Sequence, residues 1–272
     1  MALLASSGVA AAQQVGTLAL DPNAPGQGTT LVVAADQSVL SRNGQPAGTI
    51  TFALARGMRI DTAALAQLCA RRAAARSACP PETRIGFGLF SLDTRGYDSG
   101  AGDTRLTWAL DAYLAQPQRS GDAASVVLSG KLLGADLVGA LLAPSLGKPV
   151  PTTTTTVGRL LRRTGRYGIE LRFPKLPIQL GVAAPITATP TRLELSLSAV
   201  RNVRQNFTRR LKVPTLHGYE FRKIPDHRLV GHHLLRTPSK CNGSWPAELR
   251  VGFPGRVART ALSMVCTNPS LP

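Results

Sequence analysis

The sequence predicts an all-β protein, an antiparallel and jelly-roll-like β-sandwich, and three observations support that class. Apolar and polar residues alternate with a period of two in short runs along the whole chain, which is the pattern of strands buried on one face. Clusters of Gly, Pro, Asn and Asp separate those runs, as turns do. The 272 residues, 43% of them hydrophobic, suffice for a sizeable core without a metal. We therefore expect one β-sandwich domain over residues 13–272.

Seven alternating runs define the expected strands. They lie at residues 50–54, 85–89, 106–114, 167–173, 193–199, 249–253 and 260–265. Trp108 belongs to the apolar side of its run, so we expect it in the core rather than on a binding surface. The threonine run at 151–156 follows Pro149 and contains Pro151, which favours a loop.

One segment departs from the strand pattern and predicts a helix. Asp61 is a suitable N-cap residue, and the residues after it, rich in Ala and Arg, are strong helix formers. We expect a single helix of about three turns around residues 61–76.

The four cysteines predict disulfides. They allow three pairings, and the pairing of Cys69 with Cys79 and of Cys241 with Cys266 closes the shortest loops. No pair of cysteines has the short spacing of a zinc site or of a redox-active motif. The cysteines are therefore expected to be structural, and disulfides are typical of oxidising compartments.

The N-terminal residues also point to export. Residues 1–12 are apolar and end in an Ala-x-Ala pattern at Ala10 and Ala12, which is similar to the second half of a signal peptide. The basic segment that begins such peptides is missing, so we expect a truncated signal peptide. The sequence contains no run of 18 apolar residues, so no membrane-spanning helix is predicted. A secreted or cell-surface location follows.

Three segments together resemble a group of uncharacterised secreted, β-rich proteins of high-GC bacteria. These are LCARR…ACPPETRIGFG, GRYGIELRFP and CNGSWPAELRVGF…VC, which match a Cys…CP…IG.G pattern and a closing C.G.W…C pattern. The resemblance covers most of the chain after residue 45. It implies the two local disulfides and an extracytoplasmic β-sandwich, and it implies no activity.

The net charge of +17 is concentrated in the second half of the chain. Residues 1–136 carry 11 Lys and Arg against 10 Asp and Glu, whereas residues 137–272 carry 21 against 5. Such an excess favours a polyanionic partner. Charge reversal in the first half, at Arg56, Arg59, Arg71 and Arg72, is expected to weaken binding less than charge reversal in the second half, at Arg162, Arg163, Arg209 and Arg210.

Two arginine-rich runs are the candidate anion-binding residues. We expect both at strand ends and connecting loops. The candidates are Arg159, Arg162, Arg163, Arg166, Arg201, Arg204, Arg209, Arg210 and Lys212. Because the protein is expected to be exported, an anionic envelope polymer or lipid headgroups are favoured as partners over nucleic acid.

No catalytic motif, metal site or cofactor site is expected, and a non-enzymatic binding or structural protein is the leading interpretation. Two alternatives stay open. The first is a hydrolase whose site would use loop-borne histidines and a carboxylate; all four histidines, His217, His227, His232 and His233, lie close together. The second is a carrier that holds a lipid or a small apolar ligand between its sheets.

Overall fold

The structure is a computed structural model, and it describes residues 16–42, 45–95, 104–134, 152–175, 187–215 and 218–267. Strands in antiparallel pairs dominate, which confirms the all-β class. The strands are β1 (Gly16–Asp21), β2 (Gly28–Asp36), β3 (Ser41–Arg42), β4 (Gln45–Pro46), β5 (Thr49–Ala55), β6 (Arg59–Ile60), β7 (Arg84–Arg95), β8 (Thr104–Ala115), β9 (Asp122–Leu132), β10 (Thr153–Arg162), β11 (Tyr167–Phe173), β12 (Thr187–Leu197), β13 (Val200–Thr215), β14 (Gly218–His233), β15 (Leu235–Arg236), β16 (Ser244–Phe253) and β17 (Arg256–Val265). The helices are α1 (Gln37–Leu40) and α2 (Arg71–Ala75), with the 3₁₀ turns η1 (Thr62–Ala64) and η2 (Pro81–Thr83).

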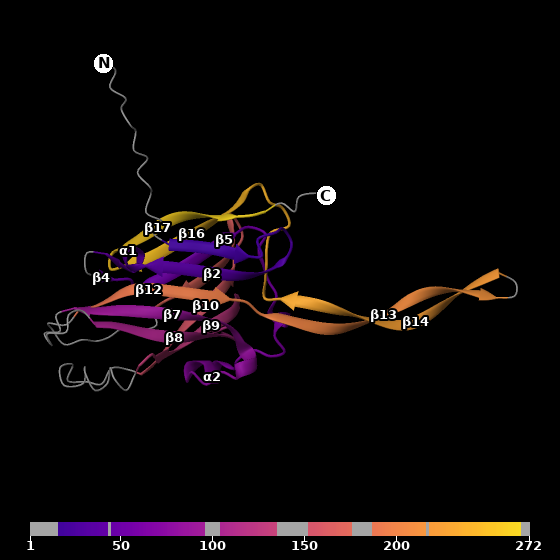
Figure 1. The fold of residues 1–272 in the computed structure, drawn as a ribbon, viewed down its shortest axis with the longest axis horizontal. Helices are drawn as coiled ribbons and strands as arrows, with labels where there is room; N and C mark the ends of the chain where they lie inside the picture. Colours follow the sequence, from indigo (N-terminus) through magenta and orange to yellow (C-terminus); the bar gives the residue numbers. More distant parts are fainter. Residues whose placement is uncertain are drawn as a thin grey trace, which may run out of the picture.

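One sheet of thirteen strands forms the body of the molecule (Figure 1). Its order is β17-β16-β5-β11-β10-β9-β8-β7-β12-β2-β15-β6, and β1 pairs with β2 beside this path. Because β1 also packs against β17, the sheet curls back toward its own beginning. The two layers that a sandwich requires are therefore opposite walls of one hydrogen-bonded sheet.

The inner face of the curled sheet encloses the larger of two apolar clusters in the described residues, and the smaller one lies between α2 and the strands β8 and β9. Phe52, Phe90 and Trp108 are fully buried in the larger cluster, and the ring centroids of Phe90 and Trp108 are 6.5 Å apart. Burial of each large apolar side chain contributes about 1.5–3 kcal/mol. The core position expected for Trp108 is confirmed.

Six of the seven alternating runs lie entirely in strands, in β5, β7, β8, β11, β16 and β17, and the run at 193–199 lies in β12 as far as Leu197. The loop expected at 151–156 is wrong from residue 153 onward. Thr153 begins β10, and residues 153–156 pair with the end of β9. Threonine is β-branched and suits a strand once a partner strand is available. The prolines at 149 and 151 therefore do not prevent a strand from beginning at Thr153.

The helix around 61–76 is confirmed only as a short one, because α2 covers five residues. Asp61 does act as an N-cap, but of η1, where its side chain accepts a hydrogen bond from the Ala63 amide. Between η1 and α2 the chain is extended at Cys69. Its amide donates to Leu114 and its carbonyl accepts from Gln116, so that Cys69 bridges to the edge of β8. Because the Cys69 backbone forms these two hydrogen bonds with β8 and its neighbouring residue Gln116, it cannot form the backbone hydrogen bonds of a continuous helix over 61–76.

The two local disulfides are present. Cys69 pairs with Cys79 across a Cα–Cα distance of 5.3 Å, and Cys241 pairs with Cys266 across 6.0 Å. The first fastens the α2 segment beside β8, and the second joins the segment before β16 to the end of β17. Trp245 packs into the core beside the second disulfide, and its indole nitrogen donates to the Lys240 carbonyl at 2.7 Å.

The longest strands, β13 and β14, are absent from the expected set. They form a two-stranded ribbon of 16 residues per strand that extends away from the body (Figure 1). The expectation that the arginine run at 201–212 and the histidine segment at 217–233 are strand ends and loops is therefore wrong for the described residues. Most of the ribbon's described side chains are exposed, and neither face packs on the core. A strand exposed on both faces needs no apolar alternation, so the sequence carries no strand signal there.

Gly88 provides a test of how closely the neighbouring strands β7 and β12 approach. A Cβ atom at this position would collide with the Glu194 carbonyl oxygen and lie 2.8 Å from Leu195 Cδ2 on β12. We predict that Gly88→Ala lowers the free energy of unfolding by about 1–3 kcal/mol, as other overpacked sites do. Denaturant unfolding measures the change. Gly48→Ala is the control, because its Cβ would meet only the Gly252 oxygen at 3.6 Å; equal effects of the two variants would contradict the prediction.

Candidate anion-binding surface

The ribbon formed by β13 and β14 carries much of the positive charge of the second half. Its described residues include eight Lys and Arg and two acidic residues. The two strands pair from Val200 opposite His233 to Thr215 opposite Gly218 without a register shift. At about 3.3 Å per residue the ribbon is about 50 Å long. It therefore presents its charge along a line rather than in one cluster.

Strand geometry sorts these residues onto two faces, because opposite residues share a face and successive residues alternate. We call one the basic face. Its charged residues are Arg204, Arg210, Lys212 and Lys223, and the described part of this face has no Asp or Glu. All four side chains are exposed. Arg210 stands directly opposite Lys223, a like-charge pair that disfavours the strand pairing unless an anion neutralises it.

Aromatic and apolar side chains interleave with the charges on the basic face. Tyr219, Phe221 and Leu229 are 66%, 67% and 70% exposed. Lys212 Nζ lies 4.0 Å from the centroid of the Tyr219 ring, a cation–π contact. Arg204 contacts Nδ1 of His227 at 3.0 Å. Exposed apolar groups among cations that contact no described carboxylate are typical of a contact surface.

The cations of the opposite face have partners within the ribbon or at its base. Arg209 lies 4.0 Å from the Asp226 carboxylate. Arg228 donates to the Gln205 side chain at 3.1 Å and lies over the Phe207 ring. Arg201 donates to the Leu65 carbonyl. The candidate residues of the ribbon therefore divide between two faces with different surroundings.

A hydrogen bond to Asp61 fixes the base of the ribbon. His232 Nδ1 and Asp61 Oδ2 are 2.8 Å apart, and the Asp61 amide donates to the Leu234 carbonyl. Burial raises the pKa of Asp61, but the hydrogen bonds from His232 and the Ala63 amide, and the charges of His232 and Arg236, outweigh it. The pKa of Asp61 therefore lies below its ordinary value.

A second group of arginines lies near the base of the ribbon. A hollow of about 500 Å³ is bounded by the turn after β5 and the turn after β10, and we call it the arginine hollow. Its charged lining residues are Arg56, Arg59, Arg162 and Arg163. Arg56 and Arg59, for which the sequence predicts the smaller contribution, thus lie in one hollow with Arg162 and Arg163, which come about 100 residues later in the chain.

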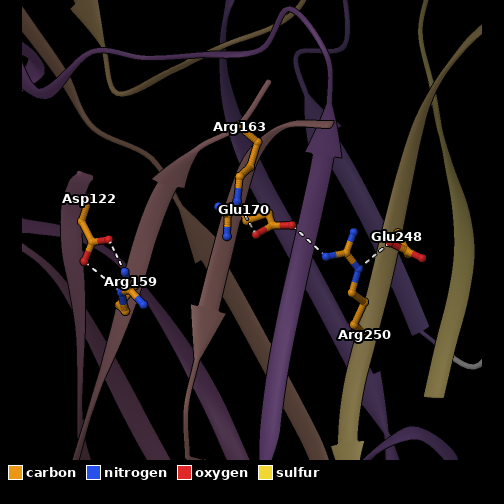
Figure 2. A network of polar contacts seen from close by, with 6 residues as sticks. All are labelled: Asp122, Arg159, Arg163, Glu170, Glu248 and Arg250. Carbon is orange, nitrogen blue, oxygen red and sulfur yellow. Dashed lines mark hydrogen bonds and ion pairs between the residues drawn. The ribbon is translucent and has the colours of Figure 1, made fainter. Parts of the chain in front are cut away.

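Three of the candidate arginines are held in contacts on the outer face of the body. Arg159 makes a two-pronged ion pair with Asp122, at 2.9 and 2.6 Å (Figure 2). This pair, against the opposing effect of burial, lowers the pKa of Asp122 below its ordinary value. Arg166 lies over the Tyr167 ring. Arg163 donates to Glu170 at 2.8 Å. Arg159 in particular is occupied by a protein carboxylate and is not available to a ligand.

Glu170 is the centre of a buried ion network. Its carboxylate accepts from Arg163 on one side and from Arg250 at 2.7 Å on the other, and Arg250 also contacts Glu248 (Figure 2). Burial raises the pKa of Glu170, but the hydrogen bonds and charges of the two arginines more than offset that effect. The pKa of Glu170 therefore lies below its ordinary value.

The histidines do not assemble a hydrolytic site in the described residues. His217 lies outside them. His227 is exposed on the ribbon, and His232 is oriented by Asp61 at its base. No described Ser, Thr or Cys side chain shares a hydrogen bond with either ring, so the His232–Asp61 pair lacks the nucleophile of a triad. No group of three or more His, Cys, Asp or Glu in the described ranges could hold a metal.

One enclosed space lies among the described core residues. A space lined by core residues such as Leu31 and Leu54 amounts to about 10 Å³, roughly the volume for one water. An open groove of about 670 Å³ lies instead on the outer face of the sheet, where Phe87 is 60% exposed. Among the described helices, none has the length and apolar character needed to span a membrane.

The Glu170 network can be tested through stability and pH. Above the ordinary carboxyl pKa Glu170 is ionised in both folded and unfolded chains, and its ion pairs stabilise the fold; that contribution is lost as pH falls through the lowered pKa of the folded state. We predict that Glu170→Gln reduces the free energy of unfolding at pH 7 by about 1–3 kcal/mol. The difference from wild type should shrink below about pH 4, near the ordinary carboxyl pKa.

Glu194→Gln is the matched control, because Glu194 pairs with Arg192 where both side chains are well exposed. It should cost less than about 1 kcal/mol. Unfolding curves of both variants at pH 7 and pH 3 give the comparison. A Glu170 variant as stable as the Glu194 variant at pH 7 would show that the network does not stabilise the fold.

No family model matches this chain, and neither the curated proteins nor the solved structures contain one that is detectably similar. The resemblance to secreted proteins of high-GC bacteria therefore stays an expectation. The function has to be inferred from the placement of charge and apolar surface on the described residues.

Proposed function

We propose that the protein is an exported, non-enzymatic binding protein that holds an anionic polymer of the cell envelope along the basic face of its ribbon. The observation that carries this proposal is the opposition of Arg210 and Lys223, with no carboxylate on the described part of that face. Two cations side by side repel each other in the free protein. A bound anion removes that repulsion, so the basic face favours a ligand that supplies negative charge.

The length of the basic face favours a polymer over a small anion. From Arg204 to Lys212 the cations extend over about 26 Å of strand. A small anion could reach one or two of them, whereas a polymer can contact all of them and gain from each. The exposed Phe221 and Leu229 side chains add apolar surface that a polymer backbone can cover.

The two disulfides support an envelope polymer rather than nucleic acid. Cys69–Cys79 and Cys241–Cys266 are compatible with an extracytoplasmic protein, because disulfides persist mainly in oxidising compartments. A polymer of glycerol phosphate units has the required charge and is the probe that we choose. DNA and anionic lipid vesicles serve as competing ligands in the test.

The proposal predicts that binding depends on one face of the ribbon. Arg210→Gln with Lys223→Gln should weaken binding to a poly(glycerol phosphate) probe by about tenfold or more. It should also lower the slope of log affinity against log salt concentration by about 0.7 per lost contact, as for a flexible polyanion. Fluorescence anisotropy of labelled polymer at several salt concentrations measures both quantities.

Arg209→Gln with Arg228→Gln is the matched control. It removes the same charge from the same ribbon but on the opposite face, where Asp226 and Gln205 contact these side chains. Equal losses from the two double variants would reduce the effect to net charge and refute a site on the basic face. Tighter binding of DNA than of the glycerol phosphate polymer would refute the envelope partner.

A further inference from the structure

The arginine hollow is a built cavity rather than a chance approach of side chains. The turn after β5 is closed by the Met58 amide donating to Ala55, and Gly57 there has a φ of +91°. The turn after β10 is closed by the Arg163 amide donating to Gly168, and Gly165 has a φ of +128°. Both glycines hold conformations that other residues rarely adopt.

Gly168 sets the distance between the two turns. A Cβ atom at this position would lie 3.1 Å from the Ala55 oxygen and 3.3 Å from the Gly57 amide nitrogen. Both distances are shorter than ordinary contacts, so the absence of a side chain allows the turns to approach. That approach brings Arg56 and Arg59 of one turn to the same hollow as Arg162 and Arg163 of the other.

The positive charge of the hollow is largely unneutralised. Within the described residues, Arg163 is the lining arginine that contacts a carboxylate, that of Glu170. Arg162 donates to the Ile60 carbonyl at 3.4 Å, and no described group forms a hydrogen bond or ion pair with the Arg56 or Arg59 side chain. A concave surface with several guanidinium groups concentrates positive potential, which attracts an anion.

The arrangement of these groups favours a phosphate. A carboxylate is planar and is satisfied by one guanidinium fork, whereas a phosphate presents oxygens in several directions and can accept from several forks at once. A hollow of about 500 Å³ has room for a phosphate together with its organic substituents. Met58, Ile60 and Ile169 also line the hollow, but they are buried and belong to the core, so the arginines provide its exposed charged side chains.

The hollow adjoins the base of the ribbon. Arg59 lies on β6 directly opposite Arg236 of β15, and β15 follows β14 after a single residue. Two residues beyond Arg59, Asp61 holds His232 of the ribbon. The pairing of Arg59 with Arg236 is a second like-charge opposition between neighbouring strands, next to the end of β14.

We propose that the arginine hollow is a phosphate-binding site that takes a phosphodiester group of the same polymer that lies on the ribbon. This site deepens the proposed function and rests on it for the identity of the polymer. Arg59 and Arg162 are its principal ligands, and Arg163 contributes while it stays bound to Glu170. The hollow binds one phosphate group of the polymer, and the basic face of the ribbon binds the part of the polymer that extends from it.

Calorimetric titration with inorganic phosphate at low ionic strength tests the site by itself. We expect one saturable site in the wild type, and a loss of affinity of about tenfold or more in Arg59→Gln and in Arg162→Gln, since each removes charge-assisted hydrogen bonds. Arg72→Gln on α2 is the matched control, because Arg72 is exposed and does not line the hollow. Equal affinities of the Arg59 and Arg72 variants, or binding without saturation, would overturn the proposal.

Gly168→Ala tests the geometry without removing a charge. The added Cβ should separate the turns and weaken phosphate binding, while thermal unfolding checks that the variant is folded. Arg59→Lys provides a variant with the charge and without the guanidinium fork, and we expect intermediate affinity. Unchanged phosphate affinity in both folded variants would show that the charge alone, and not a built site, attracts the ion.

Further binding experiments distinguish a failure of this proposal from a failure of the proposed function. The ribbon variant Arg210→Gln with Lys223→Gln should bind inorganic phosphate as the wild type does while losing affinity for poly(glycerol phosphate). Phosphate binding at the hollow together with no polymer binding by the wild type would refute the ribbon proposal and the polymer source, and would leave the phosphate site itself supported. Binding to phosphatidylglycerol vesicles in preference to the polymer would assign the phosphate to a lipid headgroup and overturn the polymer source.

Discussion

The structure depends on one constraint: a strand with alternating residues has an apolar face, and that face has to be buried. A flat sheet of this size would leave its apolar face in water. The chain meets the constraint by curling the sheet until β1 packs against β17, so that one face encloses Trp108, Phe52 and Phe90. Much of the outer face is polar, and the pairs Asp122–Arg159 and Glu170–Arg250 lie there. Small residues allow the tight curvature, since β7 approaches β12 closely only because Gly86 and Gly88 lack side chains.

The same constraint sets the ribbon apart. Two strands alone bury neither face, and an isolated ribbon of this kind is marginally stable in water. Its base is held by Asp61, by the Arg201 contact to Leu65 and by the bonds of Leu234 to the body. Farther out, the ribbon has its own backbone ladder and a few side-chain contacts, among them Lys212 with Tyr219. A ligand on the basic face would bury surface that the ribbon leaves exposed. Ligand binding would therefore also stabilise the ribbon.

Sequence reasoning predicted the half-buried strands and missed what alternation cannot signal. The runs around Phe52, Trp108 and Leu195 were predicted because one of their faces meets the core. The ribbon was missed because both its faces meet solvent, and Pro214 and Pro225 favoured loops. The short cysteine loops pointed to the correct disulfide pairs. The arginine hollow could not be predicted, because Arg59 and Arg162 meet only through the pairing of β5 with β11, and a charge count by halves of the chain places them on different sides.

Screening by salt makes the placement of these charges matter more than their total. At physiological ionic strength exposed charges influence one another over about 8 Å, whereas six residues of strand between Arg204 and Arg210 span about 20 Å. Each cluster on the ribbon and in the hollow therefore acts on a ligand almost independently of the remaining net charge. A small anion gains from the one cluster that it occupies. A chain of phosphates long enough to reach from the hollow along the basic face gains from several clusters in turn, and each contact raises the effective concentration of the next phosphate near its own cluster. The separation of the clusters, which weakens their combined field on a small ion, is thus what would make the surface selective for a polymer.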